Sequence, residues 1–264
     1  MVKFILNADD FGRSAERNRA IDDCFKQGLI SSAGLIVTGK YLPDALNYIS
    51  IGGYVDKIHL HVTLSTVLRE GDPEDVPITD TMRKDPFFCC NNKFSQFRGL
   101  PRQFSDIRKW KIVYNELISQ YDKFIEVTNG RGDLKHIDFH LWYNLTWPVS
   151  LALRIFIRKY RIKSVRFLGV HQMNSIRYKV YRLLSYNHRV ICIPASNIDY
   201  YLSKQHLFKQ YPIIELYCHP NYKEGVLLDD SPSYLKHERQ PFHKQISSLK
   251  ASVDYDLLSW VDVK

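Results

Sequence analysis

Two adjacent aspartates, Asp9 and Asp10, follow a short apolar stretch near the amino terminus, in the sequence NADDFG (residues 7–12). Two like charges side by side repel, and a carboxylate near the end of a buried strand is destabilising unless a cation meets it. Taken alone, the pair is better explained as a helix cap and an exposed acid than as two ligands. The hypothesis of a bound cation therefore needs support from elsewhere in the chain.

Histidines and carboxylates also gather in three later hydrophobic segments, residues 57–65, 135–141 and 212–220. These residues are His59, His61, His136, Asp138, His140, Glu215 and His219. Imidazole and carboxylate groups suit a divalent metal, and two histidines with one carboxylate leave positions open for water and substrate. Each motif alone is weak evidence, but their joint occurrence favours one shared site. A site with open positions predicts catalysis, since structural zinc sites close with four ligands and favour cysteine.

Alternating strand-like and helix-like segments would position these groups. Strands are predicted at residues 2–8, 32–39, 57–65, 135–141, 164–169, 189–195 and 212–220, with one more near 256–263. Helices are predicted at residues 15–27, 42–49, 105–128 and 146–160. In parallel β/α folds the chemistry gathers at the carboxyl ends of the strands, where these polar residues fall. The pattern predicts a single (β/α) barrel, with an open doubly wound sheet as the alternative.

Residues 66–106 interrupt this alternation, being polar and rich in proline. We expect them to form a long insertion after the third strand, which could lie over the active site as a lid. The chain has no internal repeat, low-complexity tract or linker, so residues 1–264 are predicted to form a single domain.

The composition predicts a globular protein, with 264 residues of which 45% are hydrophobic and 13% aromatic. There is neither an apolar stretch of membrane-spanning length nor a signal-peptide pattern, so a soluble, cytoplasmic protein is expected. The five scattered cysteines are expected to be reduced. The formal net charge of +9 favours anionic partners, and basic residues concentrate between residues 154 and 189. A solvated helix face explains that segment better than nucleic-acid binding, which is not expected.

The motifs NADDFG, LHVTLS, HIDFH and ELYCHP together resemble those of the YdjC-like carbohydrate deacetylases, which include chitooligosaccharide deacetylases and a hopanoid-biosynthesis enzyme. Their order and spacing fit this family from residue 3 to the terminal LLSWVDV. The resemblance implies a distorted, TIM-barrel-like fold that binds one divalent metal and hydrolyses the N-acetyl group of an amino sugar or its oligosaccharide. The metal would be Mg²⁺ by resemblance, with Zn²⁺ as the alternative suggested by the ligand types.

Carried over residue by residue, the resemblance makes Asp10, His61 and His140 the metal ligands, Asp9 the general base and His219 a candidate general acid. The candidates for substrate binding or for support of the ligands are His59, which stands where the family usually has glycine, and His136, Asp138, Trp142, Arg166 and Glu215. The Arg166 side chain is expected to orient the base or bind substrate. A carboxylate, from Asp138 or Glu215, is expected to orient a histidine.

The chain departs from the family after His140, where Trp142 and Asn144 stand in place of two histidines. Trp142 could offer an apolar platform for a sugar ring or simply pack. The departure keeps two alternatives open: a metal hydrolase of another ester, amide or phosphoester bond, and a catalytically impaired sugar-binding relative. The basic, aromatic segment further suggests a sugar carried on a phosphate or a lipid, and a homo-oligomer is compatible with the sequence.

Overall fold

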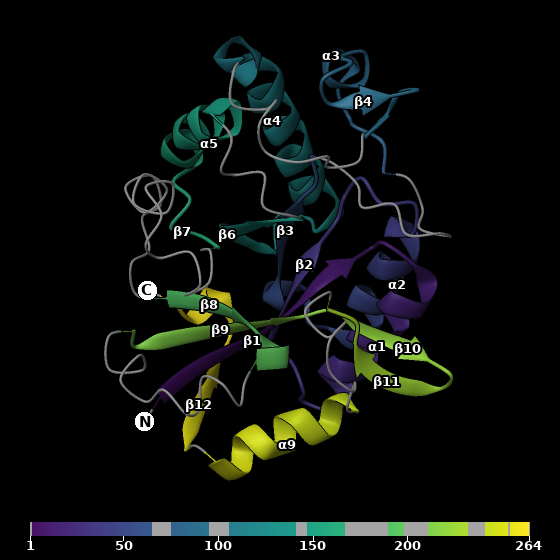
Figure 1. Cartoon of the computed structure of the whole chain (residues 1–264), viewed down its shortest axis with the longest axis vertical. Helices are drawn as coiled ribbons and strands as arrows, with labels where there is room; N and C mark the ends of the chain where they lie inside the picture. Colours follow the sequence, from purple (N-terminus) through teal and green to yellow (C-terminus); the bar gives the residue numbers. More distant parts are fainter. Residues whose placement is uncertain are drawn as a thin grey trace.

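The computed structural model describes residues 2–64, 75–94, 106–140, 147–166, 190–197, 211–231, 241–252 and 254–263. Its centre is a curled sheet with strand order β7-β6-β3-β2-β1-β9-β8, in which every neighbouring pair is parallel (Figure 1). These strands are β1 (Val2–Phe11), β2 (Ser32–Leu35), β3 (Ile58–Val62), β6 (Asp133–Phe139), β7 (Ser164–Val165), β8 (Val190–Pro194) and β9 (Ile213–Cys218). An additional strand, β12 (Tyr255–Leu258), pairs in parallel with the first residues of β1.

The predicted α/β class is confirmed, but the barrel is open. Strands β7 and β8 form the two edges of the sheet, and no pairing joins them in the described part of the chain. The result is a half-barrel that is consistent with a TIM-barrel-like fold. The curl arises because parallel strands twist relative to one another with a fixed hand.

Helices flank this sheet on its outer side (Figure 1). The long ones are α1 (Ala15–Lys26), α2 (Leu42–Gly52), α4 (Trp110–Val127), α5 (Trp147–Tyr160) and α9 (Phe242–Ser252). Short helical segments are α3 (Asp80–Arg83), η1 (Val55–Lys57), η3 (Ile107–Lys109), η6 (Ala195–Asn197) and η8 (Trp260–Asp262). Among the described residues, no helix combines the length and the apolar character needed to cross a membrane.

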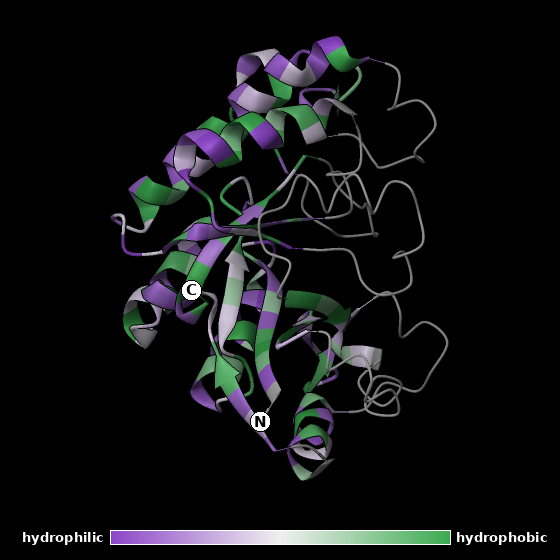
Figure 2. Ribbon diagram, turned by 90° about the vertical axis from the view of Figure 1, so that its left-hand side faces the viewer, coloured by the Kyte–Doolittle hydropathy of each residue, from purple (hydrophilic) through white to green (hydrophobic). Residues whose placement is uncertain are grey.

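Local signals in the sequence explain where these helices begin and which face they bury. The Ser14 hydroxyl caps α1 by accepting a hydrogen bond from the Arg17 backbone N–H, and Gly28 follows the helix with φ of 64°. On α4, Val113, Leu117 and Phe124 are fully buried at helical spacing. Figure 2 shows the corresponding interleaving of hydrophobic and hydrophilic residues along the helices.

The segment between β3 and α4 carries α3 and a small hairpin, β4 (Cys89–Cys90) with β5 (Lys93–Phe94). Residues 75–94 of this segment are tied to α4 by Glu116. This buried carboxylate accepts hydrogen bonds from the Ile78 and Thr79 backbone N–H groups and from the Thr79 hydroxyl. Residues 75–94 are thus docked against α4, while the insertion and its lid role remain predictions.

A second hairpin, β10 (Pro220–Lys223) with β11 (Val226–Asp229), follows β9 directly. The sequence pattern predicted a strand up to residue 220 and no hairpin beyond it. The Tyr222 hydroxyl donates a hydrogen bond to Asp23 of α1, so this hairpin packs against the first helix. Strand β11 ends at Asp229, which contacts His219 just beyond the carboxyl end of β9.

Candidate metal centre

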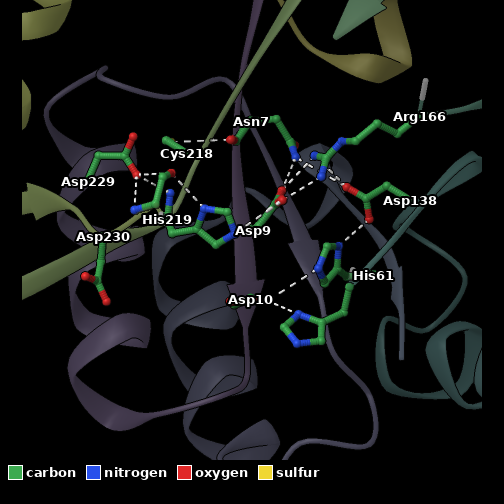
Figure 3. A network of polar contacts seen from close by, with 12 residues as sticks. Asn7, Asp9, Asp10, His61, Asp138, Arg166, Cys218, His219, Asp229 and Asp230 are labelled. Carbon is green, nitrogen blue, oxygen red and sulfur yellow. Dashed lines mark hydrogen bonds and ion pairs between the residues drawn. The ribbon is translucent and has the colours of Figure 1, made fainter. Parts of the chain in front are cut away.

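Asp9 and Asp10 lie at the carboxyl end of β1, and each residue is only 4% exposed. Asp10 has φ of 69°, in the left-handed region, and the pairing of β1 with β2 is irregular between Ala8 and Phe11. Adjacent side chains on a regular strand point to opposite faces. The irregular backbone allows both carboxylates to join one polar network (Figure 3). This conformation costs a non-glycine residue about 1–2 kcal/mol, which the rest of the site must offset.

Asp10, His61 and His140 form the cluster that best fits a metal ion. The Asp10 Oδ1 atom lies 2.7 Å from His140 Nδ1 and 3.4 Å from His61 Nε2. One potential ligand atom from each of the three residues lies within 4.8 Å of the others. The buried His61 Nε2 atom makes no hydrogen bond with the described residues. Two imidazoles, one carboxylate and an unpartnered ring nitrogen suit a divalent cation.

The charges around His61 also favour a cation at this cluster. Its Nδ1 atom lies 2.5 Å from Asp138 Oδ1, on the side of the ring opposite Asp10. Burial lowers the pKa of His61, but the charge and hydrogen bond of Asp138 and the nearby Asp10 carboxylate outweigh burial and raise the pKa to about 10. The carboxylates of Asp138 and Asp10 thus favour positive charge at His61. Gly34 of β2 leaves room for the pair, since a Cβ atom there would lie 3.0 Å from His61 Nδ1.

Asp138 supports the cluster without being well suited to hold a metal itself. Its Oδ2 atom lies 3.0 Å from His59 Nε2 and 2.7 Å from Arg166 Nη2. Burial raises the pKa of Asp138, but Arg166, His61 and His59 outweigh it and hold the pKa well below its usual range. Two further groups of residues include Asp138, one with His59 and His136 and one with Asp9 and His61. Arg166 already supplies a fixed cation to both, so the Asp10 group is the better metal site.

Asp9 is held by Arg166 through a two-pronged ion pair. Arg166 Nη1 lies 2.5 Å from Asp9 Oδ2, and Nη2 lies 2.7 Å from Oδ1. The Asn7 amide donates a further hydrogen bond to Asp9 Oδ1 at 3.0 Å. Arg166 also donates from Nε to Glu215 Oε1 at 2.9 Å, so Glu215 contacts this arginine and not a histidine. The carboxylate of Asp9 is thereby fixed beside the metal cluster with its charge compensated.

His219 directly follows β9 and is oriented by the second hairpin. The Asp229 carboxylate accepts hydrogen bonds from the His219 backbone N–H at 2.8 Å and from the Ser231 hydroxyl at 2.6 Å. Ser231 Oγ lies 3.0 Å from His219 Nδ1, while His219 Nε2 lies 3.8 Å from Asp9 Oδ2. Burial lowers the pKa of His219. His219 Nε2, the ring nitrogen on the side of Asp9, therefore faces the site (Figure 3).

The remaining predicted residues lie deeper or outside the described part of the chain. His136 stacks on Trp260, with ring centroids 3.6 Å apart, and its Nδ1 atom pairs with the Ser164 hydroxyl. Its edge contact with His59 makes it a support for the Asp138 group. Trp142 and Asn144 lie outside the described residues, as does most of the basic, aromatic segment.

Sequence reasoning missed five residues that the structure brings into the site: Asn7, Arg13, Arg17, Asp229 and Ser231. Arg13 and Arg17 had a usable signal, because they are basic residues that follow the aspartates closely in the sequence. Asp229 and Ser231 had none, since only the fold of the second hairpin returns them to His219.

An open parallel α/β sheet with two histidines and a carboxylate gathered at the carboxyl ends of its strands defines a class of half-barrel proteins with a candidate metal centre. The family model of YdjC-like proteins matches residues 3–259, and the chain therefore belongs to the YdjC-like family.

Individual relatives agree with this assignment. The chain is 25% identical to the carbohydrate deacetylase of Halalkalibacterium halodurans over 261 residues, covering 97% of this chain and 100% of that protein. It is 28% identical to the carbohydrate deacetylase of Danio rerio over 142 residues, which span 53% of this chain and only 40% of that protein.

A solved structure shares the fold over nearly the whole chain. It is a protein of Enterococcus faecalis V583 provisionally described as a cellobiose-phosphate cleavage protein, with a TM-score of 0.70 and 19% identity. The match covers 99% of this chain and 98% of that one. At this identity the likeness concerns the fold alone.

Proposed function

We propose that this chain is a metal-dependent hydrolase that removes the N-acetyl group from an N-acetylated amino sugar, either free or within an oligosaccharide or glycoconjugate. Membership of the YdjC-like family and the names of the relatives support the reaction class. The observation that carries the proposal is the buried Asp10, His61 and His140 cluster with Asp9 held beside it by Arg166.

The side chains of the cluster would hold one divalent metal, Mg²⁺ by family resemblance or Zn²⁺ by ligand type. Such an ion supplies Lewis-acid polarisation of the substrate carbonyl and of water. The Asp9 carboxylate would accept the proton of the attacking water through lone pairs that Arg166 leaves free. His219 Nε2, which lies 3.8 Å from Asp9 Oδ2, would take up this proton on its lone pair and then donate it to the leaving amine.

Acetate release tests this proposal directly. The protein would be stripped of metal with a chelator, reloaded with Mg²⁺ or Zn²⁺, and incubated with N-acetylglucosamine oligomers of increasing length. We expect acetate and a free amine on the sugar, only in the reloaded samples. Release of phosphate or of an alcohol from matched phosphoester or O-acetyl substrates, without acetate from the amide, would instead support the alternative hydrolase. Absence of turnover with retained sugar binding would support an impaired relative.

We further propose that residues 66–106 form an insertion within a single domain and act as a lid over the bound sugar. The docking of residues 75–94 onto α4 through Glu116 supports a defined resting place for this segment. Limited proteolysis with and without sugar would show whether the segment becomes protected on binding.

A further inference from the structure

Arg13, the residue directly after NADDFG, places its guanidinium against two of the three candidate metal ligands, His140 and Asp10. Its Nη1 atom lies 2.7 Å from His140 Nε2 and 3.9 Å from Asp10 Oδ2. The residue is only 4% exposed. A second guanidinium, that of Arg17, lies 3.7 Å from Asp10 Oδ2 but is also shared with Asp230 at 3.5 Å. Of these two guanidinium groups, that of Arg13 lies within hydrogen-bond distance of a predicted ligand, His140.

The contact with Arg13 determines the state of the His140 ring. A guanidinium carries only donors and keeps its proton in proteins, so His140 Nε2 must accept this hydrogen bond. The proton of the neutral ring then lies on Nδ1, which donates to Asp10 Oδ1 at 2.7 Å. Both ring nitrogens of His140 are thus engaged, and neither offers a free lone pair. His61 stands in contrast, because its Nε2 atom makes no hydrogen bond with any residue that the structure describes.

Charge repulsion adds to this blockage. Arg13 and a divalent metal would carry like charges within a few ångströms of each other, in a buried region where water screens little. The same guanidinium charge already helps to stabilise the Asp10 carboxylate. A metal that binds Asp10 and His140 must therefore replace interactions that Arg13 now makes.

We propose that Arg13 is a tethered competitor of the metal, which must leave His140 before this residue can act as a ligand. The arginine thereby sets the metal affinity of the site. This inference rests on the metal dependence of the proposed function, but not on the identity of the sugar.

The test compares metal affinities by isothermal titration calorimetry, with Zn²⁺ and Mg²⁺ as probes. R13M keeps an apolar stem and removes the charge, whereas R13Q removes the charge but keeps hydrogen-bonding capacity. We expect both variants to bind metal on the order of tenfold more tightly than the wild type. The matched control is R19M, which makes the same charge change at an exposed position of α1 and should leave the affinity unchanged. Circular dichroism establishes whether each variant is folded. If R13M does not fold, the comparison of metal affinities uses R13Q.

A crystal structure of the metal-loaded wild type provides a second readout, in which Arg13 should lie beyond hydrogen-bond distance of His140 Nε2. The proposal is overturned if the arginine keeps that contact in the loaded protein, or if the folded variants bind metal no more tightly than the wild type. Those results leave the proposed function standing as long as the wild type binds metal. If no form of the protein binds metal, this inference and the metal-dependent function fall together.

Discussion

At the scale of single residues, Arg166 balances the buried charge of the site. Its guanidinium contacts Asp9, Asp138 and Glu215, and burial of these groups would be costly without it. R166M should lower the free energy of unfolding by about 3–5 kcal/mol, the usual cost of breaking a buried ion pair. Urea denaturation measures this, with R158M on the exposed face of α5 as the control. Equal losses in the two variants would contradict the assigned role.

A substitution at Asp9 should separate the catalytic step from metal binding. D9N keeps the size of the side chain and its contact with Asn7 but removes the basic carboxylate. Turnover should fall by ~10²–10⁴-fold, the range that general base catalysis supplies, while metal affinity stays largely intact. The readouts are acetate release and calorimetry, and D56N at an exposed position is the control. Retained turnover in D9N would show that another group is the base.

At the scale of elements, the hairpin of β10 and β11 serves to orient His219. Because Ser231 donates to Asp229, its oxygen is left to accept from His219 Nδ1–H, which directs the Nε2 lone pair toward the site. S231A should reduce kcat on the order of tenfold, a part of the ~10²–10⁴-fold available from general acid catalysis, with KM little changed. Steady-state kinetics with S50A as the exposed control checks this. A rise in KM alone would assign Ser231 to substrate binding.

Helix α4 holds the insertion through one buried carboxylate. E116A would leave the Ile78 and Thr79 backbone N–H groups without their acceptor, at a cost of about 1–3 kcal/mol for each buried group that stays unsatisfied. We expect faster proteolytic cleavage within residues 75–94 and a lower urea midpoint. E126A, on the exposed face of the same helix, should change neither quantity. Unchanged cleavage in E116A would mean that other contacts anchor the segment.

At the scale of the whole molecule, buried histidines link stability to pH. Burial and the neighbouring His59 charge lower the pKa of His136 well below its usual value, whereas the unfolded chain protonates this residue near pH 6.5. Below that pH the unfolded state binds a proton that the folded state does not. The free energy of unfolding should therefore fall as the pH drops, by up to about 1.4 kcal/mol per pH unit for this group.

Urea denaturation between pH 7 and pH 5 measures this slope in the wild type and in H136F, which keeps an aromatic ring against Trp260. The slope should be shallower in H136F and unchanged in H243N, which alters an exposed histidine. Identical slopes in the wild type and H136F would show that His136 is protonated in the folded protein.

The sequence predicted the elements whose signals are local. Helix α1 was predicted from the Ser14 cap, and α4 from the apolar spacing of Val113, Leu117 and Phe124. Both signals are local, because helix formation depends on residues within a turn of each other. The hairpin of β10 and β11 escaped prediction, since its strands are short and alternate weakly. The open edge between β7 and β8 also escaped, because periodicity carries no information on strand order.

By itself, the sequence determined the kinds of group available to the site and the strand ends at which they stand, since strand ends and side-chain chemistry are properties of short segments. Only the tertiary structure decided which groups meet. Arg166 reaches Asp9 across 157 positions of the chain, and Arg13 meets His140 across 127. Such contacts depend on which strands lie side by side, and the strand order depends on the free energy of the whole packed sheet.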